Sequence, residues 1–282
     1  MLQEKARLRG GAQPVSLRSE ESRANRTTDV APGSSKSLQK ALRILFHLGE
    51  NGPDLGLTEL ATQIGLNKST AYRLLNAMEK FGLIEKMGER DRYRLGLKLF
   101  ELGNKALESR TLRGEAHHLL LQLAQQSRET VSLAVPAVGG AVCLDRVDCA
   151  DTIITVRTSV GARFQSHCTA VGKAVLAFLP EEEITAILTT DSLTRYTPNT
   201  ITSIRALRKN LEKVVRRGYA LDEEELERGL SGVAAPVRAR DGRVLAAVGM
   251  AGPTNRFRAA ELSRKIVLIR KTAASIAEGL GS

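Results

Sequence analysis

The segment from Leu57 to Leu95 constrains this chain more than any other, because it encodes two short amphipathic helices separated by a tight turn. We expect Thr58 to cap the first helix and Gly65 to end it. Asn67 is a competent N-cap for the second helix, which the pattern places at about Lys68 to Phe81. Two helices joined by so short a connection form a helix-turn-helix.

The second of these helices has one apolar and one polar face. Apolar residues recur at positions i, i+3, i+4 and i+7, which assigns that stripe to the core. The opposite face is rich in donors and carries Glu79 as its only acid. Cations neutralise phosphates, while Arg and Asn side chains can read guanine and adenine edges in the major groove. We therefore predict a DNA recognition surface made of Lys68, Ser69, Thr70, Tyr72, Arg73 and Asn76.

A β-hairpin is expected directly after the recognition helix. Two short alternating segments, Leu83 to Lys86 and Arg92 to Leu95, flank a polar turn. This hairpin would make the element a winged helix-turn-helix. Arg90 and Arg92 would place positive charge beside a flanking phosphate or in the minor groove, where it adds affinity with little sequence preference. The alternative for each arginine is a solvated surface charge.

The chain divides by pattern into four segments, and the fold class is two-domain. Residues 1–36 lack periodicity and are typical of a disordered tail. Residues 37–95 predict the α-rich winged helix-turn-helix domain. Residues 96–112 predict a linker helix whose apolar stripe we expect to pair with a second copy of the chain. Residues 113–282 alternate helices with strand-like runs, among them Ile153 to Thr158, and predict an α+β domain with a mainly antiparallel sheet.

Composition restricts the partners and the compartment. A formal net charge of +11 and a pI near 9.9 favour a polyanionic partner such as double-stranded DNA. The three cysteines have no CxxC spacing, and no signal-peptide pattern or membrane-spanning apolar run is present. We therefore expect a cytoplasmic protein with reduced thiols, no membrane partner and no cofactor. The adjacent His167 and Cys168 keep metal binding as a minor alternative to the expectation of no metal site.

Co-linear motifs run through both halves of the chain. The first half contains SLQKALRILFHL, LTELATQIGLNKSTAYRLL and YRLGLKLFELG; the second contains VCLDRVD, GARFQSHCTAVGKAVLAFLP, RYTPNTIT, RRGYALDEEE and GVAAPV. With these motifs the chain resembles the IclR family of bacterial transcriptional regulators over roughly Ser37 to Gly281. The resemblance implies an effector-binding domain at residues 113–282 with a GAF-like or profilin-like sheet. It also implies homodimers or homotetramers that bind operator DNA and respond to small organic acids or aromatic metabolites.

The resemblance further implies an effector pocket. Backbone amides of the AVGKA turn would bind an effector carboxylate, because the start of a helix offers unpaired N–H groups. Asp222 matches a pocket-lining acid, whereas Val156 and Phe164 match apolar wall positions. The three amides of the turn are those of Ala170, Val171 and Gly172.

Three positions depart from the familiar pocket of this family. Gly232 stands where a cysteine is common, and Gly249 and Ala251 stand where sensors of small acids carry serines. Their loss would enlarge the cavity and remove hydrogen-bond partners, so we hypothesise a bulkier, partly apolar carboxylate such as an aromatic acid. Nearby, we expect Lys173 to be an exposed helix lysine and Glu223 to Glu225 to be a solvated acidic run.

Two other functions compete with a ligand-responsive regulator. Catalysis is disfavoured because Gly172-Lys173 lacks the glycine and the Ser or Thr of a P-loop, and no other catalytic motif appears. Asp222 and His167 would form an acid–base pair only if the fold brought them together. The stronger alternative is a ligand-independent DNA-binding protein whose C-terminal domain only oligomerises.

Overall fold

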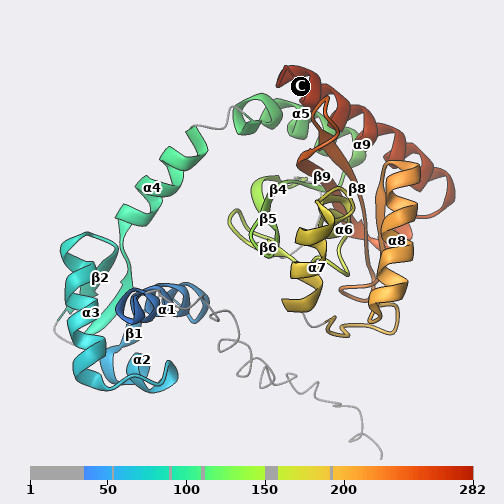
Figure 1. The fold of residues 1–282 in the computed structure, drawn as a ribbon. Helices are drawn as coiled ribbons and strands as arrows, with labels where there is room; N and C mark the ends of the chain where they lie inside the picture. The colour runs from blue at the N-terminus through green and yellow to red at the C-terminus, as the bar shows by residue number, and fades with distance from the viewer. Residues whose placement is uncertain are drawn as a thin grey trace, which may run out of the picture. The chain divides into compact units, whose positions relative to one another are not determined.

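The computed structural model describes residues 35–52, 54–88, 91–108, 112–149, 158–190 and 193–281. The chain forms two compact units, an N-terminal unit that ends at Asn104 and a C-terminal unit that begins at Lys105 (Figure 1). Nearly all of the predicted tail lies outside the described residues. The same is true of Arg90, Val156 and the predicted strand at 153–158, apart from Thr158.

The N-terminal unit is a three-helix element closed by a small antiparallel sheet. Its helices are α1 (Lys36–Glu50), α2 (Leu57–Gln63) and α3 (Lys68–Lys80). Its strands β1 (Leu55–Gly56), β2 (Ile84–Met87) and β3 (Arg92–Leu95) pair in the order β1-β3-β2. Apolar side chains from every one of these elements share one core. The predicted winged helix-turn-helix is confirmed, although the two-residue β1 was not expected.

The caps of α2 and α3 decide where the two helices begin. Asn67 caps α3, because its side chain accepts a hydrogen bond from the Thr70 amide at 3.1 Å. Thr58 does not cap α2, contrary to expectation. The helix begins two residues earlier than a Thr58 cap implies, with Gly56 as N-cap, and the Glu59 carboxylate accepts the Gly56 amide at 3.4 Å. Gly65 follows the helix at φ +67°, a backbone conformation that favours glycine.

Helix α4 (Leu97–Glu108) follows the wing and spans the boundary between the two units. Large apolar side chains stand on its surface, since Leu97 and Phe100 are about two-thirds exposed and Leu102 is half exposed. Phe100 and Leu102 are two residues apart and so lie on different faces of the helix. The pairing of this helix with a second copy stays a prediction. None of the described helices is long and apolar enough to span a bilayer.

The C-terminal unit is built on a six-stranded antiparallel sheet in the order β6-β5-β4-β9-β8-β7 (Figure 1). Helices α5 and α9 pack on one face of the sheet, and α6 packs on the other face. The predicted α+β class is therefore confirmed. Its strands are β4 (Thr130–Ala137), β5 (Gly140–Val147), β6 (Arg163–Phe164), β7 (Ala220–Glu223), β8 (Leu230–Arg238) and β9 (Val244–Pro253). Its helices are α5 (Leu112–Ser127), α6 (Ala170–Leu176), α7 (Glu181–Thr190), α8 (Ile204–Arg217) and α9 (Ala259–Gly279), with a 3-10 turn at Thr254–Arg256.

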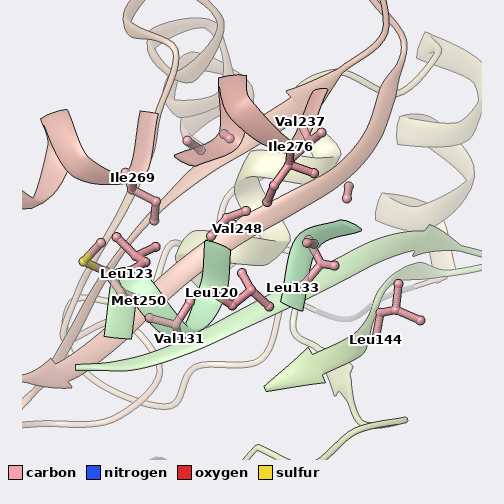
Figure 2. Close-up of a cluster of buried hydrophobic side chains, with 14 of the residues drawn as sticks. Leu120, Leu123, Val131, Leu133, Leu144, Val237, Val248, Met250, Ile269 and Ile276 are labelled. Carbon is pink, nitrogen blue, oxygen red and sulfur yellow. The ribbon is translucent and has the colours of Figure 1, made fainter. Parts of the chain in front are cut away.

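The two faces of this sheet carry different side chains, because residues alternate along each strand. Val131 and Leu133 of β4 point into the hydrophobic core under α5 and α9, which Figure 2 shows together with Val248 of β9. Thr130 and Ser132, which alternate with them along β4, point to the other face, toward α6, where they line a cavity. The hydrophobic core thus lies on one side of the sheet and the cavity on the other.

Candidate DNA-binding surface and effector pocket

The outer face of α3 presents the side chains that the sequence assigns to DNA. Lys68, Ser69, Tyr72 and Arg73 are exposed, whereas Thr70 and Asn76 are half-buried. Within the described part of the chain, neither Lys68 nor Arg73 forms a salt bridge. Neither charge is tied up in a direct ion pair among these residues, which suits an interface for a polyanion.

The wing differs, because its described basic side chains are already paired. The Arg92 Nε atom lies 2.5 Å from Asp54 Oδ1, and its Nη2 atom donates to the Asp54 carbonyl at 3.0 Å. Arg94 pairs with Glu85 at 2.7 Å in the same way. Hydrogen bonding to Arg94 holds the pKa of the Glu85 carboxyl below its usual range. Arg92 thus lies in the predicted DNA-facing hairpin with its guanidinium group already paired with Asp54.

A small cavity of about 60 Å³ opens between α6 and the sheet of the C-terminal unit, and its surface is mostly apolar. The structure places seven of the predicted effector residues around it. Gly172 does not line it, and Val156 is outside the described residues. The seven are Phe164, Ala170, Val171, Asp222, Gly232, Gly249 and Ala251. Sequence reasoning missed the other lining residues, which are Thr130, Ser132, Arg146, Thr158, Thr169, Leu226, Leu230 and Met250.

The start of α6 forms one wall of this cavity. Thr169 caps the helix, since its hydroxyl accepts the Gly172 amide at 3.0 Å and donates to the Gln165 carbonyl at 2.7 Å. The Gly172 amide is thus occupied and cannot bind an effector, in contrast to the prediction from the family resemblance. The amides of Ala170 and Val171 donate to no acceptor within the described residues. A threonine before a short helix is an ordinary N-cap signal, so Thr169 could have been identified from sequence.

Arg146 is the one cationic residue among those lining the cavity. Its Nε and Nη2 atoms lie 2.9 and 2.5 Å from Asp148 Oδ1, and the Thr130 hydroxyl donates to the same oxygen at 3.2 Å. The side chain is only 13% exposed, and its partner Asp148 holds it in place. The VCLDRVD motif contains both residues, but their meeting at the cavity depends on how β5 pairs with β4.

Asp222 is the acid of the cavity. It is 6% exposed, and its Oδ1 atom accepts the Glu225 amide at 2.8 Å. Burial disfavours the charged carboxylate and raises the pKa of Asp222 to about 7. Near neutral pH the Asp222 side chain therefore exchanges between a neutral donor and an anionic acceptor.

Behind this wall lies a buried ion pair that the sequence did not reveal. Lys173 is fully buried rather than exposed, and its ammonium group contacts the Glu225 carboxylate. Glu225 is likewise buried and does not belong to a solvated run, although Glu223 is exposed as expected. The reason is that every residue of α6 is buried, so this helix has no solvent face on which a lysine could lie.

The glycines of the cavity do not simply add empty space. A Cβ atom at Gly249 would collide with Cγ2 of Val171, which fills the position a serine side chain would take. At Gly232 a Cβ would lie 3.1 Å from the Met250 carbonyl oxygen. The expected enlargement at Gly249 is therefore wrong, because Val171 occupies that volume. The loss of hydroxyl groups makes the cavity more apolar instead.

His167 and Cys168, which the sequence offers as possible metal ligands, do not line the cavity. The His167 Nε2 atom is 3.0 Å from the Thr194 carbonyl oxygen. Burial raises the pKa of the Cys168 thiol to about 12, which opposes the thiolate form that binds metals. Among the residues with described positions, no three His, Cys, Asp or Glu side chains gather as a metal site would need.

Comparison with known proteins gives matches for both units. The IclR helix-turn-helix model matches residues 37–88, and the model of the C-terminal domain of the bacterial transcriptional regulator IclR matches residues 104–278. The transcriptional regulator KdgR of Escherichia coli K12 is 34% identical over 92% of this chain and 97% of its own length. The transcriptional repressor IclR of the same organism is 34% identical over 82% of this chain and 84% of its own length.

Solved structures give the same result. The Thermotoga maritima IclR structure is 32% identical with a TM-score of 0.67, and it covers 87% of this chain and 99% of its own. An IclR homologue from Microbacterium hydrocarbonoxydans, complexed with 4-hydroxybenzoate, is 26% identical with a TM-score of 0.75 and the same coverage. The named relatives are regulators of transcription rather than enzymes. The chain therefore belongs to the IclR family of bacterial DNA-binding transcriptional regulators.

Proposed function

We propose that this regulator changes its affinity for operator DNA when a small organic carboxylate occupies the cavity beside α6. The observation that carries the proposal is the composition of that cavity. Apolar walls surround a buried acid, Asp222, and one cation, Arg146. A concave, mostly apolar site with a few convergent polar groups is the usual form of a small-molecule site.

The carboxylate of the effector would bind at the polar end of the cavity. The Ala170 and Val171 amides have no acceptor in the described residues, and they line the cavity with Arg146. Backbone amides and a guanidinium group form charge-assisted hydrogen bonds to carboxylates. Asp222 in its neutral form would donate a further hydrogen bond, because its pKa near 7 keeps a large protonated fraction at neutral pH.

The body of the effector would be apolar, and an aromatic acid is the class we propose. Gly249 and Ala251 offer no hydroxyl groups to a polar oxoacid. The homologue that binds 4-hydroxybenzoate supports the same class. The cavity of about 60 Å³ is smaller than the roughly 150 Å³ of an engineered cavity that holds benzene. An aromatic ring would therefore require Val171 to move away from Gly249.

Calorimetric titration of the full chain tests this preference. Benzoate and 4-hydroxybenzoate should bind, whereas glyoxylate and pyruvate should bind more weakly or not at all. Val171→Ala removes the side chain that fills the cavity and should tighten binding of both aromatic acids. Val175→Ala is the matched control, because Val175 is equally buried in α6 but does not line the cavity. Tighter binding of glyoxylate or pyruvate by the native chain would contradict the proposal.

The DNA side of the proposal assigns roles to the outer face of α3. Arg73 and Asn76 would contact base edges, while Lys68, Ser69, Thr70 and Tyr72 would position the helix on the backbone. Arg90 and Arg92 of the wing would lie near flanking phosphates. Because operator DNA is the partner, we place the protein in the cytoplasm.

Regulation would follow from linkage between the two sites. We propose a homodimer or homotetramer, in which the effector favours one arrangement of the paired chains and so changes the spacing of their recognition helices. The expected coupling is about 1–3 kcal/mol, a typical allosteric value. If no acid in a broad library alters operator affinity, the C-terminal unit serves oligomerisation alone.

A further inference from the structure

A second, larger cavity of about 440 Å³ lies in the C-terminal unit, and the proposed effector function does not use it. It is formed where the end of α5 meets the 3-10 turn and the first turns of α9. Its walls are mainly polar. Four basic side chains, Arg128, Arg256, Arg264 and Lys265, line it together with a single acid, Glu261.

Three of the four cations of this cavity are held in position by protein contacts. Lys265 is only 3% exposed, and its Nζ atom lies 3.2 Å from the Glu129 Oε1 atom. Arg256 reaches the same oxygen at 3.5 Å. Arg264 donates to the carbonyl of Gln126 at 2.9 Å, which fixes the guanidinium group across the end of α5. A pre-positioned group loses little conformational entropy when a ligand binds.

Glu129 is the buried centre of this arrangement. It is 1% exposed, and neither carboxylate oxygen has a hydrogen-bond partner of good geometry among the described residues. Gly252 leaves the room it needs, because a Cβ atom there would collide with Glu129 Oε2. One buried carboxylate thus orients Lys265 and Arg256 without matching the positive charge of the whole cavity.

Arg128, which also lines this cavity, has an unusual backbone conformation. Its φ of +55° places a side chain that is not glycine in the left-handed region, at the turn between α5 and β4. This conformation is costly for most residues, and such strain collects at ligand sites. An arginine therefore lines the cavity from this turn, although a glycine would adopt the same backbone conformation at lower cost.

We propose that this cavity is a second ligand site, which binds a small polyanion carrying two or more phosphoryl or carboxylate groups. Arginine binds both groups through paired N–H donors, and a ligand with several charges satisfies the excess of cations. The four cations face two acids, Glu261 and Glu129, so a monoanion would leave half of the excess charge unmatched.

The proposed site lies on the opposite face of the sheet from the effector cavity. Thr130 and Ala251 pair across β4 and β9 and line the effector cavity. Their sequence neighbours Glu129 and Gly252 lie against each other, and Glu129 pairs with Lys265 of the polyanion site. The two sites would therefore be linked through neighbouring residues on opposite faces of one sheet, and the regulator would respond to two metabolites.

Calorimetric titration of the full chain with pyrophosphate, citrate and acetate tests the proposal at about 0.15 M salt, where long-range charge effects are screened. We expect pyrophosphate or citrate to bind and acetate not to bind. Binding of one probe alone identifies phosphoryl or carboxylate groups as the preferred class. No heat from either polyanion at about 1 mM would overturn the proposal.

Two double variants test whether the polyanion binds in this cavity or is attracted only by the net positive charge of the protein. Arg128→Gly with Arg264→Ala removes two cations from the cavity, and the glycine suits the left-handed backbone, so the variant should fold. We expect the affinity for the bound probe to fall by roughly tenfold or more. Arg240→Ala with Arg243→Ala removes the same charge from the β8–β9 turn and should change affinity less than about twofold. Equal losses in both variants would overturn the proposal. Benzoate binding at the effector cavity should persist in both, which keeps the two proposals distinguishable.

Discussion

The two units of this regulator place their charged functional groups in opposite environments. On the N-terminal unit, Lys68 and Arg73 are exposed on the predicted DNA-binding face of α3 and form no salt bridge within the described residues. In the C-terminal unit, Lys173 and Glu225 are buried and paired behind the effector cavity. The exposed cations remain free of ion pairs in the part of the chain that the structure describes, whereas the buried ion pair holds α6 and the Glu225 segment together.

The difference follows from solvation. An exposed cation costs the folded protein little, and it gains its interaction energy only when DNA releases its counterions. A buried ion has lost its water and depends on its partner to offset that loss. Substitutions on the surface of α3 should therefore change DNA binding with little effect on folding. Substitutions behind the cavity should do the reverse.

The largest expected effect is on stability, at the buried ion pair. Lys173→Met leaves Glu225 without its cation at a site that is almost closed to water. Breaking a buried pair in this way costs about 3–5 kcal/mol of unfolding free energy. Chemical denaturation followed by circular dichroism, at equal protein concentrations, measures this loss.

Two further variants control that measurement. Lys173→Met combined with Glu225→Leu removes both charges and should recover much of the lost stability, because no unpaired ion remains. Lys80→Met removes an exposed lysine at the end of α3 and should leave the midpoint unchanged. A single Lys173→Met variant as stable as the native chain would show that the pair does not anchor this region.

The same contrast explains what the sequence could predict. The exposed face of α3 could be identified because its helix has an apolar stripe, so the remaining positions must face outward. Asn67 was identified as a cap from its place before that stripe. Family motifs led to the residues that line the cavity beside α6, including Asp222. These predictions rest on local periodicity or on co-linear resemblance.

The features that the sequence did not predict depend on tertiary packing. Lys173 was misplaced because α6 is buried on all sides between the sheet and α8, and a seven-residue helix has too few positions to reveal that. The volume beside Gly249 was misjudged because Val171, distant in sequence, fills it. Arg146 reaches the cavity through the register of β5 on β4, and no local pattern encodes that register.

A smaller effect is expected on DNA binding. Arg73→Ala removes an exposed cation with paired donors and should weaken operator binding by about 1–3 kcal/mol, with a smaller loss on random DNA. The unfolding transition should not change, in contrast to Lys173→Met. Fluorescence anisotropy with an operator identified by footprinting measures the affinity. Equal losses on operator and random DNA would make Arg73 a phosphate contact.

Arg92→Ala is the matched control for that variant. Asp54 already neutralises the Arg92 side chain, so its removal should weaken binding less than Arg73→Ala does. Whatever loss remains should be similar for operator and random DNA, because a wing cation at a phosphate reads no sequence. If Arg92→Ala had the larger effect, the wing would read the operator more strongly than α3.

The smallest effect is the pH dependence of effector binding, which extends the comparison to a buried group that changes its charge. Asp222 has a pKa of about 7 in the empty cavity, with Glu225 favouring its neutral form and Lys173 its charged form. A bound carboxylate would raise that pKa further, so binding above pH 7 takes up a proton. The affinity for benzoate should then be constant below about pH 7 and fall by up to roughly tenfold per pH unit above it, which is about 1.4 kcal/mol.

Calorimetric titrations with benzoate from about pH 6 to about pH 9 measure this dependence, and buffers of different ionisation enthalpy report the proton taken up. Asp222→Asn is the control, because its amide oxygen can still accept the Glu225 amide while the titration is removed. Its affinity for benzoate should not vary over this range, because the group that titrates has been removed. A native profile as flat as that of Asp222→Asn would mean that the carboxylate binds away from Asp222. The effector would then be oriented by Arg146 and the α6 amides alone.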